Sequence, residues 1–179
     1  MFKTLISREQ IATRVKELGQ EIHKKFPEGP ILCIGILRGS FIFMADLIRE
    51  IPRNIHCEFI TASSYHNSLQ SSGTVEINSC TSTLTESILD QNILLIEDII
   101  DTGRTIKYLT GYCHNKKAKS IWTCSLLYKK RENANIEKPN FIGFEIPDVF
   151  VMGYGLDIAQ QFRNLPYIAK LEDSINLLQ

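Results

Sequence analysis

The sequence has no excess of charge of either sign. Its 179 residues include 20 Lys and Arg against 20 Asp and Glu, which gives a net charge of zero at pH 7. Because nucleic acids and anionic membranes attract basic proteins, this composition indicates neither partner. There is no apolar run of the roughly 18 residues that a membrane-spanning helix needs. The segment after Met1 also lacks the basic start and apolar core of a signal peptide. We therefore expect a cytoplasmic protein that acts on small molecules.

The sequence also lacks the cysteine spacing of a zinc site or of a disulfide framework. Its five cysteines are odd in number, and none stands in a CxxC or Cys/His pattern. They are Cys33, Cys57, Cys80, Cys113 and Cys124. A chain of this length buries roughly two-thirds of its unfolded surface without cross-links. We expect reduced thiols and a single domain that spans residues 1–179.

Short apolar runs alternate with helical patterns along the chain. Ser7 and Gln10 form a capping box, and we expect the chain to enter this first helix directly from its N-terminus. Its apolar stripe is Ile11, Val15, Leu18 and Ile22, and the helix should end before Pro27. A second helix is predicted from the apolar positions Phe41, Met44, Ala45 and Ile48, and a third runs from Thr105 to about His114.

The strands are predicted from continuous apolar runs, which suit a sheet buried on both faces. They cover residues 31–37, 57–62, 74–77, 93–96, 120–127, 141–144 and 149–152. Alternating strands and helices predict an α/β fold with a doubly wound, mostly parallel sheet flanked by helices. The Ser/Thr-rich segment at residues 63–87 is too long for an ordinary connection, and such loops in a compact domain are usually lids or binding loops.

One string of residues points to a phosphate site. The apolar run ending at Ile96 is followed by Glu97 and Asp98, and then by a short turn before a helix. The unpaired N–H groups and the positive dipole end of that helix attract a phosphate. Glycine allows close approach of the backbone, and hydroxyls add donors. The carboxylates suit ribose hydroxyls or a hydrated divalent cation. The turn consists of Asp101, Thr102, Gly103, Arg104 and Thr105.

Taken singly, these residues would equally fit a solvated acidic turn before a helix capped by Thr or Asp. The whole string resembles the phosphoribosyl diphosphate (PRPP) motif of type I phosphoribosyltransferases, in which two acidic residues precede a D-T/S-G-x-T loop. Its I-I-D-T-G-R-T form is similar to the hypoxanthine-guanine branch of that family. The resemblance implies the fold of this family, with a small hood built from the N-terminal and C-terminal segments and a flexible lid at about residues 63–87.

Two further motifs support the resemblance. Leu37, Arg38 and Gly39 close the first apolar strand. Alone they would be interpreted as a glycine turn with an exposed arginine. Family members, however, have L-K/R-G here as a pyrophosphate loop, often with a cis peptide between the first two residues. Ser63, Ser64 and Tyr65 begin the long loop and resemble the family's S-S-Y, which closes over the substrate. A polar loop start is the alternative interpretation of Ser63.

The last third of the chain supplies the base-binding residues that the resemblance implies. Lys129 would donate to the 6-oxo group of a purine, Phe150 would stack on the ring and the backbone of Val151 would bond to the base edge. Asp157 would reach a metal ion and the base side of the site, and Arg163 would contact pyrophosphate. Without the resemblance, a lysine at a strand end is usually solvated and a phenylalanine is usually part of the core.

The resemblance therefore implies an enzyme that transfers ribose 5-phosphate from PRPP to N9 of a 6-oxopurine. Mg²⁺ would be held by Glu97, Asp98 and Asp157, and Asp101 would act as acid/base at purine N7. Relatives are homodimers or homotetramers. The sequence departs from the pattern at Ile158, where many relatives have tyrosine, and at residues 70–87.

Two alternatives remain open from the sequence. One is a non-catalytic, PRPP-sensing regulatory protein of the same fold, whose nucleic-acid patch would be built from Lys116, Lys117, Lys119 and the basic run 129–131. The other is a phosphoribosyltransferase for another base, such as orotate or adenine.

Overall fold

A computed structural model describes residues 2–64, 75–79, 88–130 and 137–171. Within them, a six-stranded sheet has the order β4-β3-β2-β5-β6-β7. The five strands from β3 to β7 in this order are parallel, and β4 pairs antiparallel with β3 at the edge. The strands are β2 (Ile31–Leu37), β3 (Ile55–Ser64), β4 (Val75–Ser79), β5 (Asn92–Ile100), β6 (Ser120–Lys129) and β7 (Phe141–Ile146). The predicted mostly parallel α/β sheet is confirmed.

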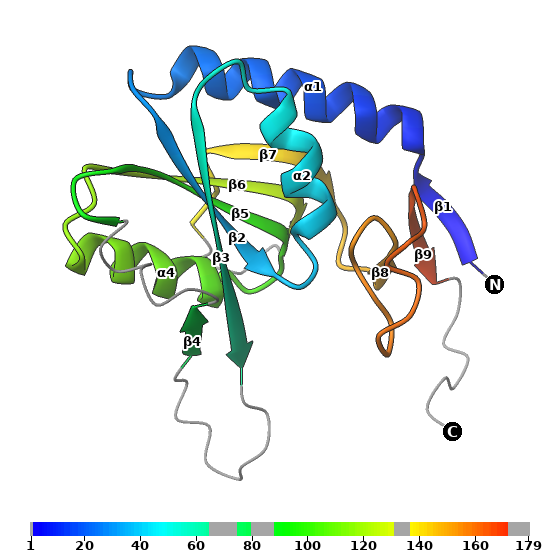
Figure 1. Ribbon diagram of the computed structural model, residues 1–179. Helices are drawn as coiled ribbons and strands as arrows, with labels where there is room; N and C mark the ends of the chain where they lie inside the picture. Colours follow the sequence, from blue (N-terminus) through cyan, green and yellow to red (C-terminus); the bar gives the residue numbers. More distant parts are fainter. Residues whose placement is uncertain (1, 65–74, 80–87, 131–136, 172–179) are drawn as a thin grey trace, which may run out of the picture.

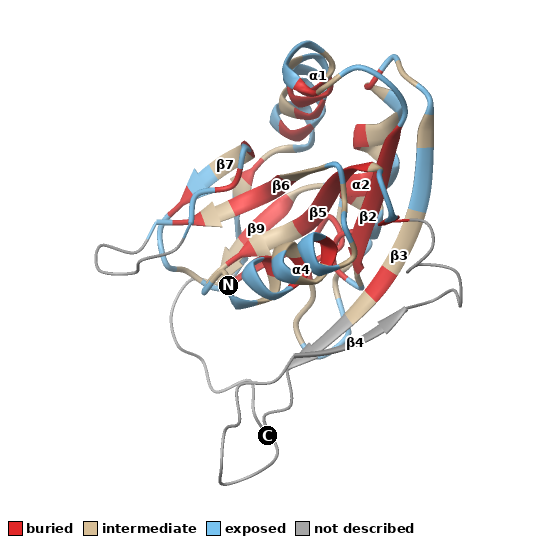
Figure 2. Ribbon diagram, turned by 90° about the vertical axis from the view of Figure 1, so that its left-hand side faces the viewer, coloured by how far each residue is buried: buried red, intermediate tan, exposed pale blue. Residues whose placement is uncertain are grey.

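Helices cover both faces of this sheet. Helices α1 (Arg8–Lys25) and α2 (Phe41–Arg49) lie on one face and α4 (Arg104–Asn115) on the other (Figure 1). Side chains of a strand alternate between the faces, so Cys33 of β2 packs in the α1/α2 layer while Ile34 packs with Leu109 of α4. The central strands β2 and β5 are buried along most of their length (Figure 2), which explains why their sequences begin with continuous apolar runs.

The first helix forms as predicted. The Ser7 side chain accepts a hydrogen bond from the backbone N–H of Gln10, and the Gln10 side chain accepts one from the backbone of Ser7 at 2.8 Å. The predicted stripe is buried, and the helix ends at Lys25. No helix in the described part of the chain is both long and apolar enough to cross a membrane.

The N-terminal segment differs from the prediction. Residues Phe2–Ile6 form strand β1, which pairs antiparallel with β9 (Ile168–Leu171), and β9 pairs in turn with β8 (Val151–Met152). This three-stranded sheet brings the two ends of the described chain side by side (Figure 1). A five-residue strand whose partner lies at the other end of the sequence leaves no local periodicity, so the expectation of a direct helix was wrong.

The buried face of α2 also differs from the prediction. Phe43, Met44 and Leu47 are buried, whereas Phe41 is 44% exposed and Ala45 is exposed. Since most residues of this short helix are apolar, its sequence fits more than one stripe and packing selects the face. The strand expected at residues 74–77 is present as β4. The rest of the predicted lid after Ser64 lies outside the described residues, and so does Tyr65.

Two helical glycines allow a matched test of the packing between α1 and α2. A Cβ at Gly19 would lie 2.5 Å from the carbonyl oxygen of Glu50, while a Cβ at Gly111 on α4 would meet nothing within 4 Å. Alanine favours a helix over glycine by about 1 kcal/mol. We expect Gly111→Ala to raise the free energy of unfolding by about that amount, and Gly19→Ala to lower it by about 1–3 kcal/mol through overpacking. Urea unfolding of both variants measures this. A gain in stability for Gly19→Ala would contradict the packing of α1 on α2.

Candidate active site

The carboxyl ends of β2 and β5 form a switch point of the sheet. From β2 the chain crosses through α2 to β3 on one side, and from β5 it crosses through α4 to β6 on the other. Connections that leave neighbouring strands in opposite directions open a crevice, where α/β proteins bind ligands. The Leu37-Arg38-Gly39 turn and the turn that begins at Asp101 both follow these strand ends. The structure therefore brings the two predicted phosphate turns together.

The first turn lies directly against a carboxylate of β5. A Cβ at Gly39 would lie 1.5 Å from Oδ2 of Asp98, so any side chain at this position would displace the Asp98 carboxylate. The Leu37–Arg38 peptide bond is cis. The hydroxyl of Ser40, which is fully buried, donates to the carbonyl oxygen of Ile36 at 2.7 Å. This bond holds the chain where it leaves β2 and enters α2.

The two acidic residues lie inside β5 and not beyond its end. The strand continues to Ile100, and Glu97 is 8% exposed. Burial, reinforced by the charge of Asp98, raises the pKa of Glu97 well above its usual value. Burial also raises the pKa of Asp98, to about 6, although the Ile99 N–H and the Arg163 charge oppose this. Burial therefore disfavours the ionised form of both carboxylates.

The second turn leaves the start of α4 open to an anion. Gly103 is the N-cap with φ 70°, in the left-handed region, and as a glycine it makes no side-chain cap hydrogen bond. The alternative of a helix capped by Thr or Asp is therefore wrong. The first N–H groups of α4 have no partner within the helix and lie at the positive end of its dipole. Both features favour the binding of a phosphate at this position.

A second arginine comes to the crevice from the segment after β8. Arg163 forms an ion pair with Asp157 at 2.6 Å, and it donates to the carbonyl oxygen of Gly155 at 2.7 Å. Arg38 and Arg163 both donate to the side-chain oxygen of Gln160, at 3.2 and 3.3 Å. The structure thus places the two predicted pyrophosphate residues together. Gln160 was not predicted, because a glutamine in a loop has no motif that marks it.

The turn that contains Gly155 touches the first phosphate turn through backbone alone. A Cβ at Gly155, which has φ 101°, would lie 2.1 Å from the carbonyl oxygen of Gly39. Next to it, the Tyr154 hydroxyl donates to Asp46 of α2 at 2.5 Å. Burial, together with this bond to Asp46, raises the pKa of Tyr154. The bond therefore ties the Gly153–Gly155 turn to the helix that follows Arg38 and Gly39.

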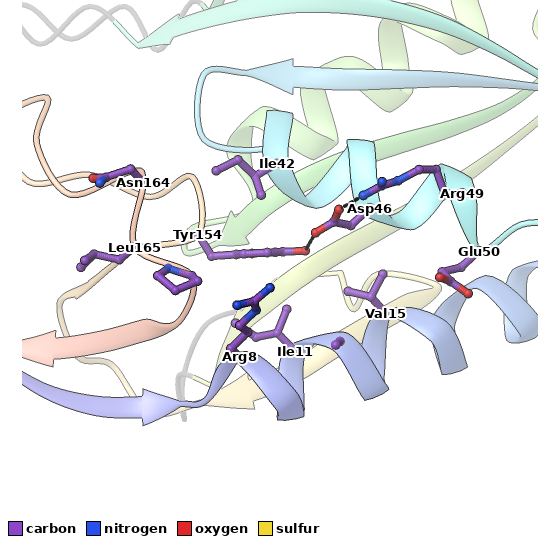
Figure 3. Close-up of a pocket in the computed structure, with 12 residues that line it drawn as sticks. Arg8, Ile11, Val15, Ile42, Asp46, Arg49, Glu50, Tyr154, Asn164 and Leu165 are labelled. Carbon is purple, nitrogen blue, oxygen red and sulfur yellow. Dashed lines mark hydrogen bonds and ion pairs between the residues drawn. The ribbon is translucent and has the colours of Figure 1, made fainter.

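The Tyr154–Asp46 bond borders a pocket of about 510 Å³ between α1, α2 and the segment that contains Leu165 (Figure 3). None of the predicted site residues lines this pocket. The two phosphate turns lie elsewhere, after the carboxyl ends of β2 and β5.

The third part of the site is a buried lysine. Lys129 is the last residue of β6 and is 8% exposed, and its ammonium lies 3.1 Å from Oδ1 of Asp148 and 3.5 Å from Oδ2 of Asp101. Phe150 is 67% exposed, while Val151, which begins β8, is buried. The alternatives of a solvated lysine and a core phenylalanine are therefore both wrong. Asp148 was not predicted from the sequence.

Not all predicted residues come together. Among the residues that the structure describes, no three Asp, Glu, His or Cys form a group that could hold a metal ion, so Glu97, Asp98 and Asp157 do not make a ready-built cage. Ser63 and Ser64 end β3, paired with Glu76 and Val75 of β4.

Comparison with known proteins decides the family. A family model described as a phosphoribosyl transferase domain matches residues 3–159. The chain belongs to the phosphoribosyltransferase family. A hypoxanthine-guanine phosphoribosyltransferase of Bacillus subtilis is 46% identical over 173 residues, which cover 97% of this chain and 94% of the relative. One from Aquifex aeolicus is 42% identical over 96% of this chain and 95% of the relative.

A solved structure agrees with these relatives. The crystal structure of a hypoxanthine-guanine phosphoribosyltransferase from Bacillus anthracis has a TM-score of 0.84 and 39% identity to this phosphoribosyltransferase, covering 95% of this chain and 98% of that chain. The fold described above is therefore that of a phosphoribosyltransferase.

The raised pKa of Asp98 predicts how the stability of this phosphoribosyltransferase depends on pH. Because the pKa is about 6 in the folded chain against an ordinary 3.8, the free energy of unfolding should fall as the pH rises from 4 through 6. Asn cannot ionise, so we expect Asp98→Asn to be more stable than the unmutated protein by about 1 kcal/mol at pH 7.5 and by little at pH 4. Urea unfolding at both pH values measures this.

Glu145→Gln is the control for that experiment. Glu145 is an exposed carboxylate whose pKa is lowered by the hydrogen bond from Lys138, so its replacement should give no gain at pH 7.5. An equal gain for Asp98→Asn at both pH values would mean that packing, and not ionisation, is responsible.

Proposed function

We propose that this protein is a purine salvage enzyme that transfers the 5-phosphoribosyl group of PRPP to N9 of a 6-oxopurine, hypoxanthine or guanine, and releases pyrophosphate. The observation that carries the proposal is the buried Lys129, which lies 3.5 Å from Asp101 at the edge of the phosphate turn. An ammonium is only a donor and suits a 6-oxo group. The names of the relatives from B. subtilis and A. aeolicus support the same substrates.

The base would lie between Lys129 and Phe150. The exposed ring of Phe150 offers a face on which a purine can stack, and the Val151 backbone lies directly beside it. In a purine, the 6-oxo oxygen and N7 are neighbours on the same edge. A lysine beside a carboxylate therefore matches that edge: Lys129 donates to the oxygen, and Asp101 handles the proton on N7.

The phosphate groups of PRPP would bind at the two turns. The 5-phosphate would accept hydrogen bonds from the N–H groups at the start of α4, where Thr102, Arg104 and Thr105 add donors. The pyrophosphate would lie along the Leu37–Gly39 turn, facing Arg38 and Arg163. Departure of pyrophosphate leaves oxocarbenium-like charge on the ribose, so holding both substrates in line and neutralising the leaving group supplies the catalysis.

Mg²⁺ fits this site through a few carboxylates and the substrate. Magnesium in proteins is usually bound by one or two carboxylates together with substrate phosphates and water. Glu97 and Asp98, whose ionised forms are disfavoured by burial, offer such oxygens, and the charge of Asp157 contributes to the raised pKa of Asp98. When bound, the ion would neutralise charge on the leaving pyrophosphate. The cytoplasmic location and a homodimer or homotetramer stay predictions.

The role of Asp101 is tested by its amide. We expect Asp101→Asn to leave PRPP affinity unchanged while kcat falls by about 10² to 10⁴, the usual contribution of a positioned acid/base group. Calorimetry gives the PRPP affinity, and absorbance of the nucleotide product gives kcat. Near-normal turnover would remove Asp101 from the mechanism.

The choice of base is tested by a panel of bases. In a partly desolvated pocket the Lys129 ammonium would meet the 6-amino donor of adenine and be left unpaired, and sites built on such a contact discriminate by about 10⁴ to 10⁵. We expect kcat/KM for hypoxanthine to exceed that for adenine by a large part of this range. Lys129→Met should lose activity on hypoxanthine and narrow the gap.

Lys130→Met is the matched control for this experiment, because the neighbouring Lys130 is exposed and should not affect either base. Comparable kcat/KM values for adenine and hypoxanthine in the unmutated protein would contradict the proposed 6-oxopurine specificity. Efficient turnover of orotate, without turnover of any purine, would also contradict this specificity.

A further inference from the structure

Lys129 lies between two carboxylates, and only one of them belongs to the proposed phosphate turn. The other is Asp148, whose Oδ1 is the nearer, at 3.1 Å against 3.5 Å for Asp101. The Lys129 side chain is 10% exposed, whereas those of Asp148 and Asp101 are 52% and 42% exposed. A buried ammonium needs a charged partner close by. The position of Lys129 therefore depends on how these two acids share it.

The backbone places Asp148 where it can act on both walls of the base site. In the β6–β7 ladder Lys129 pairs with Ile146, and Asp148 follows two residues later. The Val149 N–H donates to the carbonyl oxygen of Pro147 at 2.9 Å, so the chain turns tightly here. Phe150 comes two residues after Asp148. One residue thus links the lysine at the end of β6 to the segment that presents the stacking ring.

We propose that Asp148 is a positioning residue for the purine: it holds the Lys129 ammonium away from Asp101, so that the lysine is free to donate to the 6-oxo group. This role rests on the proposed function. Without the Asp148 carboxylate, the lysine moves toward Asp101 and pairs with it more tightly. The donor then leaves the base edge, and the acid/base group loses its freedom to meet N7.

The first test is steady-state kinetics of Asp148→Ala with hypoxanthine and PRPP varied in turn. A hydrogen bond to a charged group supports an effect of about tenfold, so we expect kcat/KM for hypoxanthine to fall by about that factor while KM for PRPP changes less than about twofold. Asp148→Asn retains an oxygen that accepts from Lys129, so its kcat/KM for hypoxanthine should lie between the values of Asp148→Ala and the unmutated protein. A merely structural role would change both KM values together.

The matched control is Glu145→Ala. Glu145 also accepts from a lysine, Lys138, at 2.6 Å, and it lies three residues before Asp148, but this pair is exposed and faces solvent. We expect unchanged kinetics. A loss in Glu145→Ala equal to that in Asp148→Ala would overturn the proposal, because it would locate the effect in the strand and turn and not in the Lys129 contact.

The decisive test is a double-mutant cycle with Lys129→Met. If Asp148 acts through the lysine, adding Asp148→Ala to Lys129→Met should change kcat/KM for hypoxanthine by less than about twofold. A further loss near tenfold in the double variant would overturn the proposal. Should Asp148→Ala fail to fold, Asp148→Asn takes its place in the cycle. No turnover of hypoxanthine by the unmutated chain would instead remove the proposed function, and this role with it.

Discussion

The parallel pairing of β2 with β5 is the constraint on which the site depends. Both strands are buried on both faces, so their register is fixed, and their chains leave in opposite directions at the same edge. This single contact places the Gly39 turn against Asp98 and sets it opposite the start of α4. If β2 had a different neighbour, the two phosphate turns would lie apart. Each could still hold an anion, but together they could not hold the two ends of one substrate.

The electrostatics of the free site are asymmetric in a way that suits its ligands. On the pyrophosphate side, Arg163 is held by Asp157 and shares Gln160 with Arg38, so the cations already have partners. Along β5, in contrast, the buried Glu97 and the half-buried Asp98 both have raised pKa values. The two arginines therefore already have partners, while burial disfavours ionisation of the two carboxyl groups. A ligand that brings both phosphates and a divalent cation suits both sides of the site. The cation would stabilise the ionised carboxylates, and the phosphates would replace the present partners of the two arginines.

Local sequence patterns predicted those parts of the fold that local physics determines. The capping box at Ser7, the buried strands and the helix after Gly103 all depend on neighbours within a few residues. The β1–β9 pairing depends on segments at opposite ends of the chain and left no periodicity to recognise. Asp148 and Gln160 were missed for a similar reason, since each acquires its role from a partner distant in sequence, Lys129 or Arg38. The position of Glu97 and Asp98 inside β5 was also missed, because acidic residues after an apolar run usually end a strand.

The contact between Gly39 and Gly155 has a mechanical consequence. One turn leaves the large sheet after β2, and the other follows β8 in the three-stranded sheet of β1, β9 and β8, here called the hood. The two turns meet backbone to backbone without a side chain between them. A side chain can change rotamer to absorb a displacement, but a carbonyl packed on a glycine cannot. Any tilt of the hood relative to the large sheet is therefore transmitted directly to the turn beside Asp98. Divergence of this scaffold toward another base must leave this junction intact and act through replaceable side chains such as Lys129, Asp148 and Phe150.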